Sequence, residues 1–237
     1  MTVSAQKWRV TVGGHGETSA IFTPSSMAAG PLFVCAHGAG GHMDDASMRA
    51  VCERLRSRGL SIVRFNFLYR ERSSNRPDPM PVLKACFDAV TEHTRRLLQP
   101  QRLIIGGRSM GGRVASMLAA DSYACDALLL LAYPLHPAGQ PQKLRDAHLE
   151  RIDVPALCIN GTRDALCTRE LMQQIVDRLD RSWTMHWLEG ADHSFRVLKS
   201  SDRTDDDVLD EVAETSIRWL HLHKSLKVES FKSPAGA

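Results

Sequence analysis

This chain of 237 residues has no long hydrophobic segment and little imbalance of charge. No apolar run approaches the ~20 residues that a membrane-spanning helix needs. The start, MTVSAQKWRV, lacks the apolar stretch of a signal peptide, so we expect a cytoplasmic protein that does not enter a membrane. The net charge of +3 is too small to indicate nucleic-acid binding.

Cysteines are few and scattered, and no C-x-x-C pair marks a zinc or redox motif. Several of the six cysteines stand inside apolar segments, where a free cysteine behaves as a small core residue. The pair His221 and His223 has a spacing that does not share one face of a helix. We therefore expect reduced structural thiols, no metal site and no cofactor.

Short apolar runs that end in turn formers alternate with helical patterns along the chain. Such runs are typical of strands buried on both faces of a parallel sheet, and they occupy residues 31–38, 60–67, 102–107, 127–134, 154–161 and about 183–188. Residues 7–14 and 17–24 indicate two antiparallel strands at the start of the sheet. The alternation predicts one doubly wound α/β domain over residues 1–223, with a mostly parallel sheet flanked by helices. We expect residues 224–237 to form a flexible tail.

Helical spacing of apolar residues separates these strands. The first predicted helix, around residues 48–55, has Asp44 and Asp45 before it as caps and Gly59 after it as a stop. Further helices are expected around residues 83–90, 114–120, 172–179 and 209–220. The interval 133–153 holds only a turn-rich start and one short helix, which is too little for a cap domain.

The stretch IIGGRSMGGRVAS, residues 104–116, places many small residues at one bend between a strand and a helix. A phosphate-binding P-loop would need a lysine after the glycines, and a dinucleotide turn would need G-x-G-x-x-G; neither pattern fits. The pattern G-x-S-x-G does fit, centred on Ser109. In that motif a nucleophilic serine lies on a strained turn, and its glycines let neighbouring backbone approach closely.

A serine nucleophile needs a base, and the base needs an orienting carboxylate. In this kind of fold they follow the serine in the order acid, then histidine, each after a later strand. Asp164 in CINGTRDALCT and His193 in WTMHWLEGADHSF match that order, so we expect a triad with Ser109. His136 is the alternative base, although it precedes Asp164, and Asp192 is the alternative carboxylate.

The glycine-rich turn CAHGAGGHMDD follows an early strand and precedes a helix. We expect the backbone N–H groups of Ala39 and Met110 to form the oxyanion hole, because both precede or open helices. The side chains expected to contact a small-molecule substrate are those of His37, Arg108, Asn66 and His136.

Arg108 stands inside the serine motif, and further arginines cluster around the loop after residues 60–67, at Arg64, Arg70, Arg72 and Arg76. Guanidinium groups bind carboxylates well, which leads to the hypothesis of an acidic substrate. A solvated basic surface, or ion pairs within the protein, would explain the same cluster.

Four motifs together resemble the α/β-hydrolase superfamily over about residues 7–222: H-G-x-G at 37–40, the serine motif at 107–111, GTRD at 161–164 and DHSF at 192–195. RFNF, GGRSMGGR, YPLHPAGQP and LEGADHSF resemble its small lidless branch, related to testis-expressed protein thirty and NSL complex subunit three, with dienelactone-hydrolase-like relatives. The resemblance implies the fold and the triad of Ser109, Asp164 and His193, but no settled substrate. Dienelactone hydrolases use a cysteine nucleophile, which this chain replaces with serine.

We therefore expect a serine hydrolase that cleaves an ester or related acyl bond of a small molecule and needs no cofactor. The alternative is a binding or scaffold protein that kept the fold, because some members of the branch act in larger assemblies. A third hypothesis is a peptidase, but the sequence shows no propeller or cap domain that would select peptides. The sequence contains nothing that predicts an oligomeric state.

Overall fold

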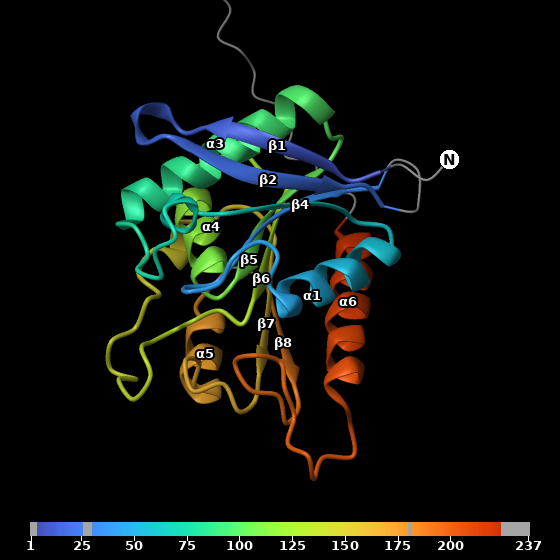
Figure 1. Cartoon of the computed structure of the whole chain (residues 1–237). Coiled ribbons are helices and arrows are strands. Elements are labelled where there is room, and N and C mark those ends of the chain that lie inside the picture. Colours follow the sequence, from blue (N-terminus) through green and yellow to red (C-terminus); the bar gives the residue numbers. More distant parts are fainter. Residues whose placement is uncertain (1–3, 26–29, 180–181, 224–237) are drawn as a thin grey trace, which may run out of the picture.

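A sheet of eight strands forms the centre of the molecule (Figure 1). The computed structural model describes residues 4–25, 30–179 and 182–223. The strands, in spatial order, are β1 Gln6–Thr11, β2 Glu17–Thr23, β4 Ser61–Phe65, β3 Leu32–Ala36, β5 Leu103–Arg108, β6 Ala127–Leu131, β7 Ala156–Gly161 and β8 Trp183–Leu188. The pairs β1–β2 and β2–β4 are antiparallel, and all later neighbours are parallel. The predicted mostly parallel sheet with two antiparallel strands at its start is confirmed.

Helices cover both faces of this sheet, with α1 and α6 on one side and α3, α4 and α5 on the other (Figure 1). Alternate residues of β3 enter separate cores: Val34 belongs to the cluster that includes α3 and α4, and Phe33 to the cluster that includes α1 and α6. Such strands are continuously apolar because both of their faces are covered. The helices are α1 Ala46–Ser57, α2 Leu68–Glu71, α3 Met80–Leu98, α4 Met110–Ala120, α5 Arg169–Val176 and α6 Asp205–Leu222, with single turns η1 Gly13–His15 and η2 Leu149–Arg151.

The helix after β5 begins at Met110, earlier than the predicted start at residue 114. Glycine has a low helix propensity, which made Gly111 and Gly112 look like part of the turn. Both are buried, and a Cβ on Gly111 would lie 2.5 Å from the carbonyl oxygen of Ala36. Close packing of the helix start on β3 therefore outweighs propensity.

The predicted capping of α1 by aspartates is wrong. Asp45 occupies the position before the helix, but its side chain makes no capping hydrogen bond. Its carboxylate instead accepts the backbone N–H of His42 at 2.8 Å, and Asp44 lies 3.5 Å from a guanidinium nitrogen of Arg64. The predicted stop is confirmed, because Gly59 has a positive φ of 108° directly after the last turn.

Nothing in the described part of the chain forms a separate cap domain. Between β6 and β7 only the single turn η2 is present. The described helices include none with both the length and the hydrophobicity that a transmembrane segment requires. All six cysteines are free, and five of them are buried. The predicted tail, residues 224–237, lies outside the described residues.

Candidate active site

Ser109 occupies a sharp turn between β5 and α4, with a backbone φ of 51° and ψ of −115°. A positive φ is strained for a residue with a side chain and persists only where the surroundings enforce it. The enforcing contact is the close approach of this turn to β3. A Cβ on Gly107, whose φ is 144°, would lie 2.2 Å from the carbonyl oxygen of Ala36. The glycines of the motif are therefore required by geometry.

Replacing Gly107 by alanine tests this requirement. We expect Gly107→Ala to lower the free energy of unfolding by about 3 kcal/mol or more, because the backbone strain and the overlap with Ala36 add. The control is Gly14→Ala, since a Cβ on Gly14 would meet no atom within 4 Å; it should change stability by no more than about 0.5 kcal/mol. Urea unfolding of both variants measures the difference, and equal stabilities would contradict the interpretation.

The structure brings Ser109, His193 and Asp164 into one chain of hydrogen bonds. Nε2 of His193 lies 2.9 Å from Oγ of Ser109, and Nδ1 lies 2.8 Å from Oδ2 of Asp164. Since an ionised carboxylate only accepts, Nδ1–H donates to Asp164, which leaves Nε2 free to accept the serine hydroxyl proton. The three side chains come from the loops after β5, β7 and β8, which meet at the same edge of a parallel sheet.

Asp164 is held in place by a residue that the sequence analysis missed. The side-chain amide of Asn160 donates to Oδ2 of Asp164 at 3.1 Å, and the backbone N–H of Leu166 donates to Oδ1 at 2.8 Å. Asn160 is fully buried at the end of β7 and also bonds both backbone groups of Tyr133. A polar residue at the end of an apolar strand, four positions before a predicted catalytic acid, was the available signal.

The alternative residues are occupied elsewhere. The carboxylate of Asp192 accepts the backbone N–H groups of Ser194 and Arg196, which shapes the loop around His193. His136 is buried and its Nε2 lies 2.9 Å from the hydroxyl of Thr168. Neither residue takes part in the hydrogen-bonded chain of Ser109.

The amides expected to form the oxyanion hole flank Ser109. Met110 is the first residue of α4, and Ala39 lies in the turn after β3. That turn packs against the serine, since a Cβ on Gly38 would lie 3.4 Å from the Cβ of Ser109. Within the described residues, the N–H of Ala39 donates to no backbone carbonyl, and the N–H of Met110 donates to none outside α4. Both are therefore available to an oxygen bound beside Ser109.

His37 supports this turn from inside the protein. Its side chain is buried, and Nε2 accepts the backbone N–H of Phe67 at 3.1 Å. Nδ1 therefore carries the proton and donates to the carbonyl oxygen of Gly38 at 2.8 Å. Burial lowers the pKa of His37 to about 4, so the ring is neutral at physiological pH.

The buried ring predicts a loss of stability in acid. Because the pKa of His37 falls from its ordinary 6.5 to about 4, the unfolded chain binds the proton more readily between those values. The contribution of the neutral His37 ring to the free energy of unfolding is fully present above about pH 6.5. It decreases by up to about 3 kcal/mol as the pH falls to about 4. Urea unfolding at about pH 7 and pH 4.5 measures this loss. His37→Asn should lose less over the same interval, and an equal loss in both proteins would refute the assignment.

A pocket of about 350 Å³ opens above Ser109. Of the residues expected to contact substrate, His37 and Arg108 line it, whereas Asn66 and His136 do not. The side chain of Asn66 accepts the backbone N–H of Met43 and donates to Glu71 instead. The expectation of substrate contact for Asn66 and His136 thus finds no support, because neighbouring segments use their polar atoms.

The arginines near residues 60–76 mostly serve internal contacts. Arg64 donates to the carbonyl oxygen of Met43 at 2.6 Å, and Arg70 donates to that of Ser74 at 2.9 Å. Arg72 pairs with Asp78. Of these positions Arg76 alone lacks a side-chain partner within the described residues. The alternative explanation, ion pairs and structural bonds, therefore holds for this cluster, whereas Arg108 remains at the pocket.

Arg108 contacts the loop that carries His193. Its Nη2 donates to the carbonyl oxygen of His193 at 2.9 Å, and its guanidinium lies 5.5 Å from the centre of the Phe195 ring. The elbow and the histidine loop are thus joined directly. Among the described residues, no group of three or more histidine, cysteine, aspartate or glutamate side chains could hold a metal ion.

Comparison with known proteins identifies a matching family and solved structures of similar fold. Residues 29–221 match the sequence model of a family described as an alpha/beta hydrolase domain. An alpha-beta serine hydrolase homologue from Coxiella burnetii has a similar structure, with a TM-score of 0.74 and 20% identity over 93% of this chain and 99% of that one.

Two further solved structures are similar in fold. A dienelactone hydrolase from Anabaena variabilis has a TM-score of 0.72 and 19% identity, over 94% of this chain and 99% of that one. An α/β serine hydrolase without a lid, from Xanthomonas campestris, has a TM-score of 0.71 and 21% identity, over 92% of this chain and 96% of that one. The fold of this chain therefore recurs in proteins of similar length, one of which is described as having no lid.

Proposed function

We propose, because this chain belongs to the alpha/beta hydrolase family, that it is a serine hydrolase which cleaves an ester or related acyl bond of a small molecule. The observation that carries the proposal is the continuous hydrogen bonding from Ser109 through His193 to Asp164. A serine hydroxyl is a weak nucleophile unless a base within hydrogen-bond reach removes its proton.

In the proposed reaction, Oγ of Ser109 attacks the carbonyl carbon of the substrate while Nε2 of His193 takes the hydroxyl proton. Asp164 stabilises the imidazolium that forms and holds the ring in the required tautomer. The N–H groups of Ala39 and Met110 stabilise the negative charge on the carbonyl oxygen. His193 then protonates the leaving group. In the second half of the reaction, Nε2 of His193 takes a proton from a water molecule that attacks the acyl carbon, and returns it to Oγ of Ser109 as the acid product leaves.

A non-catalytic binding or scaffold protein is the alternative. Such a protein would need neither a serine on a strained turn nor a base beside it. Backbone strain of this kind costs about 1–3 kcal/mol and clusters at functional sites. The strain at Ser109 therefore favours the hydrolase over the scaffold. The resemblance to testis-expressed protein thirty and NSL complex subunit three, which raised this alternative, stays a prediction.

Labelling by a fluorophosphonate probe separates the two readings. The proposed hydrolase should form a covalent adduct on Ser109, identified by mass spectrometry of the digested protein. A panel of activated esters, thioesters and lactones would then show which acyl bond is cleaved. Absence of both labelling and turnover would favour the scaffold.

The lining of the active-site pocket predicts a preference for short acyl groups. Its lining consists mostly of polar or small residues, and each methylene left in water forfeits about 0.8 kcal/mol of possible binding. Among p-nitrophenyl esters, we expect kcat/KM to be highest from acetyl to butyryl, with no activation at an oil–water interface. A steady rise through acyl chains of about eight and twelve carbons would contradict this prediction.

A further inference from the structure

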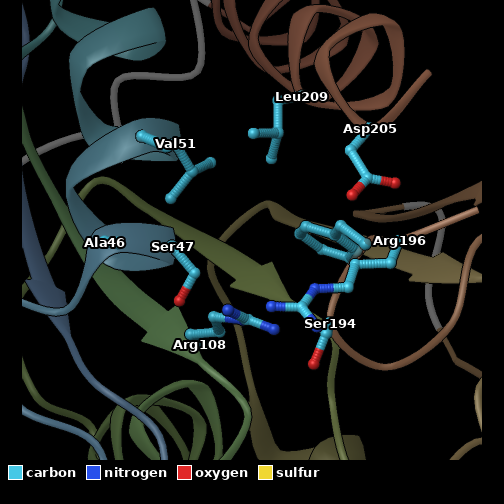
Figure 2. Close-up of a pocket in the computed structure, with 10 residues that line it drawn as sticks. Ala46, Ser47, Val51, Arg108, Ser194, Arg196, Asp205 and Leu209 are labelled. Atoms are coloured by element: carbon cyan, nitrogen blue, oxygen red, sulfur yellow. The ribbon is translucent and has the colours of Figure 1, made fainter.

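Figure 2 shows the residues that line a second pocket, which has a volume of about 240 Å³. This pocket and the active-site pocket are adjacent, because Ser47, Arg108 and Ser194 line both of them. α1, the start of α6 and the loop after β8 enclose the second pocket. Its lining combines an apolar group with three charged side chains: Ala46, Ala50, Val51, Phe195 and Leu209, and Arg108, Arg196 and Asp205.

Arg108 brings a positive charge into this pocket, and the carboxylates of Asp192, Asp164 and Asp45 act on it only from beyond ion-pair distance. Its one hydrogen bond is to the carbonyl oxygen of His193, and within the described residues it forms no ion pair. Burial lowers the pKa of Arg108, because the charged form loses hydration. A guanidinium nevertheless stays charged at physiological pH. Arg108 therefore carries its charge at the pocket with a carbonyl oxygen and an aromatic ring as direct partners, but with no carboxylate in direct contact.

Arg196 adds a second positive charge to the same space. Its side chain extends toward Arg108 and away from the carboxylate of Asp205 (Figure 2). It forms no ion pair among the residues that the structure describes. Arg196 is exposed to solvent, whereas Arg108 is partly buried. Two like charges that face each other repel, and an anion between them removes the repulsion.

The acidic groups nearby are engaged with backbone. Asp192 accepts the N–H groups of Ser194 and Arg196 at 2.7 and 2.9 Å. Asp205 accepts the N–H of Val197 at 2.9 Å. Neither carboxylate lies within ion-pair distance of Arg108 or Arg196, so the two guanidinium groups remain open to a ligand.

We propose that the second pocket binds a carboxylate of the substrate between Arg108 and Arg196. The substrates are then esters that carry a negative charge a short apolar spacer away from the bond cleaved at Ser109. Planar guanidinium forks match the geometry of a carboxylate, and the apolar walls suit a spacer of a few methylene groups. This inference rests on the proposed hydrolase activity.

Matched pairs of esters test the proposal. One pair is mono-p-nitrophenyl glutarate and its neutral glutaramate, with the carboxylate in the acyl part. The other pair is meta-carboxyphenyl butyrate and meta-carbamoylphenyl butyrate, with the carboxylate in the alcohol part. For each pair, the quantity measured is kcat/KM of the anionic ester divided by kcat/KM of the neutral ester. For one of the pairs, we expect Arg196→Gln to reduce this ratio by about tenfold or more, because the carboxylate loses a charged hydrogen-bond donor.

Lys199→Gln is the control, because it removes an exposed positive charge from the same loop outside the pocket. It should keep the wild-type ratio, which excludes a general effect of charge. Ratios that are the same in wild type and Arg196→Gln for both pairs would overturn the proposal.

A binding measurement separates this inference from the proposed reaction. Calorimetry on Ser109→Ala, with glutarate as the probe and glutaramide as its neutral counterpart, needs no turnover. If Ser109→Ala binds glutarate but not glutaramide, and the double variant Ser109→Ala, Arg196→Gln binds glutarate about tenfold or more weakly, the anion site is supported. This result does not require any ester to be cleaved. Equal binding of glutarate by both proteins, or no binding by either, would overturn the proposed anion site. The hydrolase proposal is tested separately by fluorophosphonate labelling of Ser109.

Discussion

The Ser109→Ala variant is expected to lose fluorophosphonate labelling completely and turnover on the order of 10⁶-fold, the scale seen when a triad serine is removed. The hydroxyl is the group from which His193 takes a proton, and no other hydroxyl lies on the strained turn between β5 and α4. Alanine removes only that hydroxyl, so the fold should stay intact by circular dichroism and urea unfolding.

Ser47→Ala is the matched control for this change. Ser47 lines the same pocket but lies outside the hydrogen-bonded chain, so the variant should still be labelled. Unchanged turnover in Ser109→Ala would show that the hydrolysis occurs elsewhere on the protein, and the assignment of the nucleophile would be wrong.

Asp164→Asn is expected to reduce kcat/KM by up to about 10⁴-fold, the magnitude known for the same change in trypsin-type triads. The carboxylate of Asp164 accepts Nδ1–H of His193 at 2.8 Å and thereby keeps Nε2 free for the serine proton. An amide at this position can donate to Nδ1, which moves the ring proton to Nε2 and disables the base. Steady-state kinetics with a short activated ester measures the loss.

The comparison with Asp192→Asn decides between the two candidate carboxylates. Asp192 accepts two backbone N–H groups of the loop around His193, so its replacement should loosen the loop and reduce turnover much less. A larger effect in Asp192→Asn than in Asp164→Asn would refute our choice of the orienting acid.

Local pattern along the chain was sufficient to predict the strands and five of the six described α-helices, whereas the short α2 was not predicted. It also indicated the three side chains that the structure brings into one hydrogen-bonded chain. The strands β3 and β6 are continuous apolar runs because helices cover both faces of the sheet, and this pattern is visible in each strand by itself. The order Ser109, Asp164, His193 was also predictable, since each of these loops follows a strand and the carboxyl ends of parallel strands share one edge.

The start of α4 was not predictable from propensity. Glycines at 111 and 112 favour a turn in isolation, and their burial against β3 and β5 allows the helix to begin at Met110. The prediction that aspartates cap α1 was wrong for a related reason, because the carboxylate of Asp45 accepts the N–H of His42 in the preceding turn instead. Both outcomes depend on how tightly one segment packs against another.

The surroundings of the triad depend on contacts between segments far apart in sequence. Asn160 was missed because its role comes from Tyr133 and Asp164 together, and Arg196 was missed because its charge matters only beside Arg108. Asn66 was an expected substrate contact, but Met43 and Glu71 occupy its amide. A sequence shows which side chains can donate or accept a hydrogen bond. Whether that capacity is used inside the protein or left for a ligand depends on which loops meet at the edge of the sheet, because hydrogen bonds and ion pairs act only at close range.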